Sequence, residues 1–212
     1  MDEGLNQAAS SLIERVKGII INPKAEWPKI EAESTSEQDI FLKYVLPLAA
    51  IGPVASLIGQ QVFGISVIIA TIKPSLGFSI ATCVIAYVIS VAMVMLIAFI
   101  ANALAPSFGG QANRTNAVKL AAYSNTAGWL AGIFGLIPAI GLFSLLGLYN
   151  LYLYYTGVTP MMKVPQDKQV GYVVVLILCV IVAMFVIAPI TAALVGAFGL
   201  SPVASLTDIQ IR

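Results

Sequence analysis

The chain has 212 residues, of which 59% are hydrophobic and 10% are charged, and its formal net charge is +1. Because about a quarter of the residues are charged in an ordinary soluble domain, this composition predicts a membrane protein. The near balance of charges gives no reason to expect a nucleic-acid partner. With no histidine and only two cysteines, Cys83 and Cys179, we expect no metal site, no cofactor and no disulfide framework.

The charged residues divide the chain into an N-terminal region and an apolar body. Eight of the ten acidic residues and five of the eleven basic residues precede Tyr44. We therefore predict a cytoplasmic helical region at 1–43, a transmembrane domain at 44–200 and a short tail at 201–212.

The N-terminal region begins with a predicted amphipathic helix that Asn22-Pro23 ends. Its apolar residues recur at spacings of three and four, so they form one stripe: Leu5, Ala8, Ala9, Leu12, Val16, Ile19 and Ile20. Two positions are open for this stripe. It lies in the membrane interface, or it packs on the protein's own spans.

A second short helix is predicted in PKAEWPKIEAES, where Trp27 and Ile30 provide a small apolar face. Ser34 and Glu37 have the spacing of a capping box, in which each side chain bonds a free backbone N–H of the other residue. We therefore expect a helix that starts at this box and continues into the first span.

The body contains four stretches without Asp, Glu, Lys or Arg, and one of them, 120–162, is long enough for two helices. A helix needs about 20 apolar residues to cross the hydrocarbon core, and Pro138 and Gly141 interrupt this stretch. The predicted fold class is all-α, an integral membrane bundle of five transmembrane helices with a short amphipathic N-terminal cytoplasmic region. The predicted spans are 44–68, 78–104, 118–137, 140–157 and 172–197.

The basic residues predict the orientation of this bundle. Five spans place nine lysines and arginines on the side of the N-terminus, and only Lys73 and Arg212 on the other side. Because loops rich in lysine and arginine stay in the cytoplasm, we predict a multi-pass protein of the cell inner membrane. Its N-terminus is expected in the cytoplasm and its C-terminus outside.

The apolar stretches offer no evident catalytic chemistry. An ionisable residue inside a span usually marks an ion path, a proton relay or a catalytic group, and these stretches contain no carboxylate, lysine or arginine. A serine or threonine nucleophile would lack an evident base. We therefore expect a protein that is not an enzyme and has no catalytic residue.

Small residues predict close helix packing in two of the spans. Gly128 and Gly132 form a G-x-x-x-G pair, and Ala188, Ala192 and Gly196 have the same spacing in the last span. Such residues let helix backbones approach closely in lipid. They indicate packing within one chain or, alternatively, a seam between two copies in a homo-oligomer.

Polar residues open the third predicted span: Tyr123, Ser124, Asn125 and Thr126. Ser and Thr hydroxyls in a helix can bond a carbonyl of the preceding turn, and Tyr123 can reach the lipid headgroups. The first interpretation is therefore structural, as a device that orients this span. The second is a polar surface, shared with Asn102 and Tyr172, that contacts a partner or a lipid headgroup.

Several of these stretches resemble a known family. YSNTAGWLAGIFGLIPAIGLFSLLGLYNLYLYYTGV, followed by KVPQDKQVGYVVVLIL, looks like the bacterial branch of the Yip family, the Ypt/Rab-interacting membrane proteins. NPKAEWPKIEAES followed by FLKYVLPLAAIGPVASLIG is similar to the segment that leads into the first span of those relatives. Tyr123, Ser124 and Thr126 match the family's opening of the third span, and Ala127 stands where proline is common.

Gly171 and Tyr172 resemble the family's Gly-Tyr pair at the start of the last span. The resemblance implies five spans and a cytoplasmic N-terminal region. It also implies that eukaryotic relatives bind Rab GTPases, but the Asp-Leu-Tyr-Gly-Pro element of those members is absent here. The resemblance therefore informs the architecture more than the function.

These observations favour a non-enzymatic adaptor or membrane-organising factor. Its expected partners are membrane lipids and, through residues 1–43, other membrane or cytoplasmic proteins. The alternative is a transporter or channel for a small neutral or amphipathic solute, which the Pro- and Gly-rich first span and the polar Gln60, Gln61 and Asn102 favour.

Overall fold

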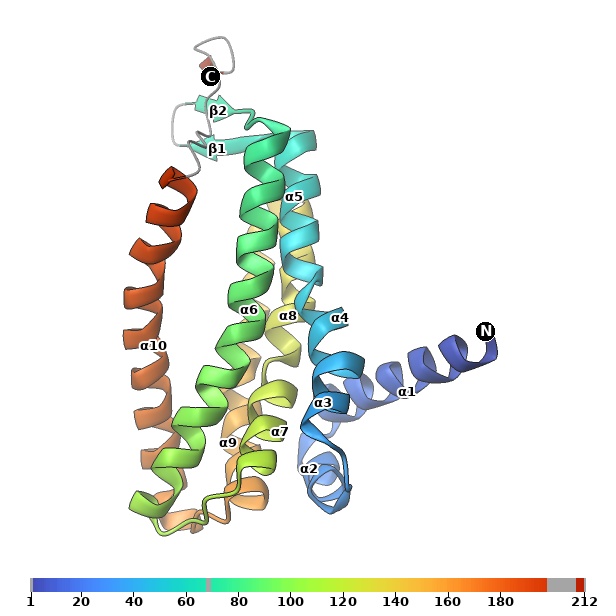
Figure 1. Cartoon of the computed structure of the whole chain (residues 1–212), viewed down its shortest axis with the longest axis vertical. Coiled ribbons are helices and arrows are strands. Elements are labelled where there is room, and N and C mark those ends of the chain that lie inside the picture. The colour runs from blue at the N-terminus through green and yellow to red at the C-terminus, as the bar shows by residue number, and fades with distance from the viewer. Residues whose placement is uncertain (1, 68–69, 198–208, 212) are drawn as a thin grey trace.

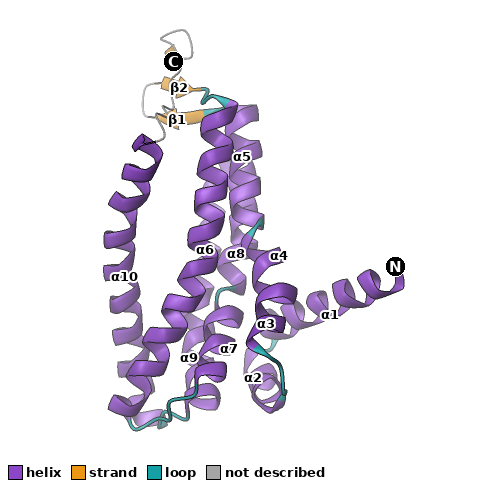
Figure 2. Ribbon diagram, in the orientation of Figure 1, coloured by secondary structure: helices purple, strands orange, loops and turns teal. Residues whose placement is uncertain are grey.

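The computed structural model describes residues 2–67, 70–197 and 209–211, and most of these residues are helical (Figure 2). The long helices run side by side along one axis, with both strands of a hairpin at one end and the N-terminal helix projecting sideways near the other (Figure 1). In chain order the elements are α1 (Asp2–Ile21), α2 (Pro23–Ala32), α3 (Glu37–Ile40), η1 (Phe41–Val45), α4 (Leu46–Ala49), α5 (Ile51–Phe63), β1 (Ile65–Val67), β2 (Ala70–Ile72), α6 (Leu76–Leu104), η2 (Ala105–Phe108), α7 (Arg114–Ser124), α8 (Thr126–Ala131), η3 (Gly132–Leu136), η4 (Pro138–Leu148), α9 (Tyr149–Met162), α10 (Gln166–Ala197) and β3 (Ile209–Ile211).

Three helical stretches among the described residues are long and apolar enough to cross a membrane. They are Glu37–Phe63, Leu76–Phe108 and Gln166–Gly196. They contain the predicted span 78–104, all but the last residue of 172–197, and most of 44–68. The coarse prediction of a helical membrane protein is thus confirmed.

The first of these stretches is built from four short elements, α3, η1, α4 and α5, rather than one regular helix. Pro47 cannot donate a backbone hydrogen bond and its ring crowds the carbonyl four residues earlier, so the preceding turn widens into the π-helical η1. The stretch begins at Glu37, and its N-cap is Ser36, whose hydroxyl accepts from the N–H of Asp39 at 3.1 Å. The predicted cap at Ser34 was therefore wrong by two residues.

Residues 114–162 form two broken helical legs. Arg114–Leu136 comprises α7, α8 and η3, and Pro138–Met162 comprises η4 and α9. Ile137 between them is extended, with φ −127° and ψ 106°, because a residue before proline avoids the α region. The turn lies one residue before the predicted site, and the segments on both sides of it, η3 and η4, are 3₁₀ helices in place of α-helices.

A small sheet, which the sequence patterns did not predict, closes the end of the molecule where α5 meets α6. β1 pairs antiparallel with β2, and β2 pairs antiparallel with β3. Gly64, at φ 76°, ends α5 and turns the chain into β1, a conformation that favours glycine.

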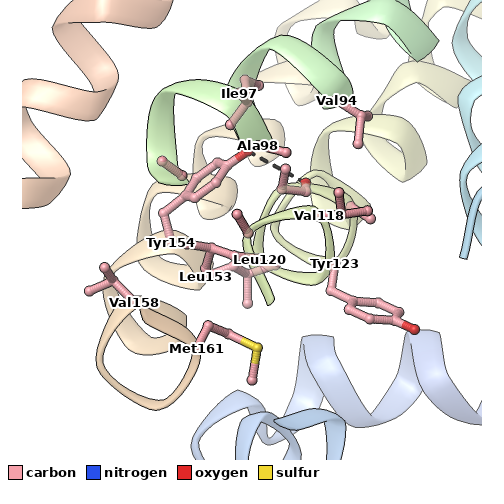
Figure 3. Close-up of a cluster of buried hydrophobic side chains, with 14 of the residues drawn as sticks. Val94, Ile97, Ala98, Val118, Leu120, Tyr123, Leu153, Tyr154, Val158 and Met161 are labelled. Atoms are coloured by element: carbon pink, nitrogen blue, oxygen red, sulfur yellow. Dashed lines mark hydrogen bonds between the residues drawn. The ribbon is translucent and has the colours of Figure 1, made fainter. Parts of the chain in front are cut away.

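The hydrophobic core lies between α6, α7 and α9 and extends to the N-terminal region (Figure 3). α7 is buried on almost all sides, since every residue from Ala117 to Ser124 is buried. In Figure 3, Leu120, Leu153 and Tyr154 point into the cluster, whereas the ring of Tyr123 points toward α1 and α2. The core therefore joins the membrane-spanning part to the N-terminal helices.

Candidate functional site

Tyr123 lies at the joint between the N-terminal region and the bundle. It is only 5% exposed, and its ring packs edge-on against Tyr44 and Trp27 at centroid distances of 4.6 Å and 6.5 Å. The guanidinium carbon of Arg15 lies 5.7 Å from the centre of the same ring. We call Arg15, Trp27, Tyr44, Lys119 and Tyr123 the docking cluster.

Arg15 ties α1 to α2. Its Nη1 donates to a carboxylate oxygen of Glu26 at 2.6 Å, and its Nη2 pairs with Glu33. Burial disfavours the charged guanidinium, but the hydrogen bond and charge of Glu33 outweigh this, and the pKa of Arg15 is raised. The Arg15 side chain is only 19% exposed, so the ion pairs lie in a partly water-excluded joint.

Trp27 is the largest side chain that α2 buries. It is fully buried, and its indole Nε1–H donates to the hydroxyl of Thr156 on α9 at 3.1 Å. Its ring occupies the space above Gly157, where an added Cβ would lie 2.6 Å from two ring carbons. Because Gly157 has no side chain, Trp27 can pack against α9 at this point, and α2 docks there.

Lys119 holds the other end of α2. The lysine is 2% exposed, and its ammonium donates to the backbone carbonyls of Ile30, at 2.8 Å, and Glu33. The last carbonyls of a helix have no partner within the helix, and a cation there also suits the helix dipole. A basic residue of the bundle thus caps a helix of the N-terminal region.

The polar residues at 123–126 serve local structure in this arrangement. The hydroxyl of Thr126 donates to the Tyr123 carbonyl at 2.6 Å and lies 2.7 Å from the hydroxyl of Tyr44. Asn125 donates to the Ala121 carbonyl at 2.8 Å and to the Tyr154 hydroxyl at 3.0 Å. These bonds accompany the break between α7 and α8.

Ser124 differs from its neighbours. Its hydroxyl is fully buried and has no hydrogen-bond partner among the described residues. The back-bond that we expected from a helical serine at this position is therefore not formed.

Asn102 and Tyr172 lie apart from the docking cluster. The fully buried Tyr172 donates from its hydroxyl to the Ala101 carbonyl at 2.6 Å and packs edge-on against Phe108. Asn102 lines a separate cavity on α6 and α7. The structure therefore does not bring the six predicted polar residues onto one surface.

The two groups of small residues have different surroundings. A Cβ at Gly132 would lie 2.7 Å from the Cα of Gly52, so α5 and η3 touch through their backbones. The side-chain amide of Asn150 lies against Gly128, and its oxygen accepts a hydrogen bond from the backbone N–H of Gly128 at 2.8 Å. A Cβ at Gly196 would have no atom of the described residues within 4 Å, and the side chains of Ala188 and Ala192 are exposed.

Beside the docking cluster lies a polar groove of about 290 Å³. It lies between α1, the α2–α3 connection and the start of the first span, and Arg15, Glu33, Asp39 and Lys43 line it with two charges of each sign. Asp39 and Lys43 are paired at 2.5 Å. The groove is thus a nearly neutral, polar surface at the base of α1.

Sequence reasoning did not find the roles of Arg15 and Lys119. Both were counted among the nine basic residues that set the orientation, and Arg15 was also placed beside the apolar stripe of the N-terminal helix. Their roles escaped prediction because their partners lie on other helices. The available signal was Trp27, predicted as an apolar face of α2, since a tryptophan in a polar helix indicates a docking surface.

The fold and this joint define the class: a helical membrane protein whose N-terminal helices are fixed to an apolar bundle. The family model described as Yip1 domain matches residues 17–203, and the chain belongs to that family. The matched range begins within α1 and includes the whole docking cluster except Arg15. No curated protein and no solved structure matches the chain.

Proposed function

We propose that this protein is a non-enzymatic adaptor of the cell inner membrane that binds lipids or other proteins through α1. One observation carries the proposal: α2 is locked to the bundle, whereas the N-terminal half of α1 projects away from it (Figure 1). Ile19 on the stripe of α1 is fully buried against the core, but Ala9 is exposed and Ile13, at the edge of the stripe, is 52% exposed.

The position of α1 suits a membrane interface. The helix leaves the bundle sideways, so it runs across the long axis of the bundle (Figure 1). An amphipathic helix in this position buries its apolar stripe at the headgroup boundary. The N-terminal half of the stripe then lies in the membrane interface, and the C-terminal half packs on the protein's own bundle. Each of the two predicted positions thus applies to one half of the helix.

The proposal includes five spans, with the N-terminus in the cytoplasm and the C-terminus outside. Multiplying the residues of each element in Arg114–Leu136 by the rise per residue of its helix type gives a total length of about 35 Å. This length is enough to cross a hydrocarbon core of about 30 Å. η3 also packs against the middle of α5, because Gly135 lies against Ser56 and Gly59. The two broken legs thus supply the third and fourth spans.

Labelling tests the span count. A cysteine at Ile137, in a chain with Cys83→Ser and Cys179→Ser, is expected to react with an impermeant maleimide added outside the cell. A cysteine at Ser34 is expected to react only after the membrane is opened. Labelling of position 137 from the cytoplasmic side alone would disprove the five-span topology.

Vesicle flotation and crosslinking test the adaptor role. We expect Ile13→Glu, or removal of residues 2–10, to weaken recruitment of partner proteins or binding of a second vesicle. Gln7→Glu is the matched control, since it adds the same charge on the opposite, exposed side of α1. If Ile13→Glu and Gln7→Glu behave as the unmodified chain does, α1 is not the binding element.

A second candidate function, passage of a small neutral solute, is favoured by a cavity of about 470 Å³ between α5, α6 and α8. Hydroxyl and amide groups line it at membrane depth, among them Ser56, Gln60, Thr82 and Ser90. Glycerol flux into liposomes tests this function. Thr82→Leu should reduce the flux, whereas Thr191→Leu, which removes an equivalent back-bonded threonine from α10, should not.

A further inference from the structure

A small cavity on the flank of α6 and α7 combines apolar walls with two polar groups at one end. Its volume is about 250 Å³. The apolar walls come from both helices, and the polar groups are an amide and a guanidinium: Met95, Ala98, Phe99 and Val118, with Asn102 and Arg114.

The amide oxygen of Asn102 is an acceptor without a donor. Its Oδ1 is completely covered, yet no described residue donates a hydrogen bond to it. A buried polar atom without a partner destabilises the folded state, and lipid offers no water to replace the missing donor. A bound molecule that carries an O–H or N–H group would supply it.

Arg114 adds a positive charge at the same end. Its Nε lies 3.2 Å from a carboxylate oxygen of Glu37, and 73% of its side chain is exposed. The guanidinium has five N–H donors in a planar fork, so the pairing of Nε with Glu37 leaves donors for a second ligand. An oxyanion at the mouth of the cavity would therefore find a cation beside it.

The order of groups along α6 gives the shape of the ligand. Asn102 lies in the last turns of α6, and Met95 lies two turns deeper, about 10 Å away along the helix. Phe99 is 72% exposed and Met95 41%, so the apolar wall is open to the bilayer. From the end of α6 inward, the cavity thus offers first a cation, then an amide acceptor and then an apolar surface.

We propose that this cavity binds an anionic phospholipid whose headgroup carries a hydroxyl group, such as phosphatidylglycerol. The phosphate contacts Arg114, the Asn102 amide turns so that its Oδ1 enters the cavity and accepts from the hydroxyl, and the upper part of one acyl chain lies against Met95 and Phe99. The cavity is too small for a whole lipid, so the remaining chain continues along α6 in the bilayer. The proposal rests on the membrane placement proposed above but not on α1.

Native mass spectrometry of the full chain in a neutral detergent tests this site with short-chain phosphatidylglycerol as the probe. We expect Asn102→Leu and Arg114→Gln each to weaken its binding about tenfold, the effect of one lost hydrogen bond to a charged or well-placed polar group. Lys163→Gln is the matched control. It removes one partly exposed cation that pairs with Glu31 and lies outside the cavity, and it should leave binding unchanged.

A thermal melt without lipid separates a binding role from a structural one. Asn102→Leu removes the unpaired acceptor, so it should raise Tm in lipid-free detergent and reduce the rise that phosphatidylglycerol causes in the unmodified chain. Equal binding by Arg114→Gln and the unmodified chain would overturn the proposal. So would equal binding of phosphatidylcholine or of glycerol phosphate, since these lack the charge or the acyl chain.

The chain without residues 2–10 distinguishes this site from the proposed role of α1. It should bind phosphatidylglycerol as the full chain does. Loss of lipid binding in this truncated chain would place the lipid site on α1 and overturn the assignment to the α6–α7 cavity.

Discussion

Replacing Gly157 by alanine should loosen the attachment of α2 to the bundle. The new Cβ would lie 2.6 Å from ring carbons of Trp27 and 2.8 Å from a methyl group of Leu120. Carbon atoms in van der Waals contact are about 3.5–4.0 Å apart, so the indole must move by about 1 Å. That movement breaks the 3.1 Å hydrogen bond from Trp27 to Thr156.

The expected cost follows from three contributions. Overpacking of this kind costs about 1–3 kcal/mol, and the lost hydrogen bond costs about 1 kcal/mol. Alanine is favoured over glycine inside a helix by about 1 kcal/mol, but α9 is helical whether or not α2 is docked, so this contribution cancels. The clashing atoms belong to side chains that can shift, so we take overpacking at the low end of its range. The docked state of α2 should therefore be destabilised by about 2 kcal/mol, which raises the population of the undocked state about thirtyfold.

Limited trypsin digestion in mild detergent measures this population. Cleavage after Lys24 requires α2 to open, and its rate follows the open population when opening and closing are fast. Gly157→Ala should therefore be cut at Lys24 about thirtyfold faster than the unmodified chain. Gly196→Ala is the control, because its Cβ would have no described neighbour within 4 Å. If the two variants are cut at the same rate, the packing of Trp27 on Gly157 does not hold α2 in place.

Four further substitutions test the joint and the helix packing. Lys119→Met removes the cation that caps α2 and should lower the free energy of unfolding by about 2 kcal/mol, measured by thermal melting in detergent. Tyr44→Phe and Thr126→Val should show a coupling of about 1 kcal/mol in a double-mutant cycle, because their hydroxyls lie 2.7 Å apart. Gly132→Ala should cost up to about 3 kcal/mol in the same melts, because its Cβ would strike the backbone of α5.

Controls for these variants lie in the same chain. Lys163→Met removes a partly exposed lysine from a surface ion pair and should change stability by less than about 1 kcal/mol. Gly141→Ala fills open space and should be neutral. If Lys119→Met is as stable as Lys163→Met, Lys119 does not cap α2. If the Tyr44→Phe and Thr126→Val effects are additive, the two hydroxyls are not coupled. If Gly132→Ala is neutral, Gly132 is not in close contact with α5.

Much of the architecture follows from patterns that are local in the sequence. Long apolar stretches predicted α6 and α10, since hydrophobic length is the main determinant of a membrane helix. Asn22-Pro23 predicted the end of α1, and the Asn22 side chain does cap α2 by accepting from the N–H of Ala25. These features depend on neighbouring residues alone.

The features that escaped prediction depend on residues far apart in the sequence. Lys119 caps a helix that ends near Glu33, and Trp27 is seated on Gly157. Neither relation has a fixed spacing. The sheet also escaped, because its strands have three residues each and β3 lies far from β2. The polar cluster at 123–126 was found, but its neighbours from the N-terminal region were not.

The position of β3 sets an order of events during synthesis. A chain grows from its N-terminus, so β1 and β2 emerge long before Ile209–Ile211, and the outer edge of β2 has no partner in the sheet until then. β3 follows α10 in the chain, and it reaches β2 only when α10 has taken its place in the bundle. Completion of the three-stranded sheet is therefore a late step of biogenesis, and amide protection in β2 would report that insertion is complete.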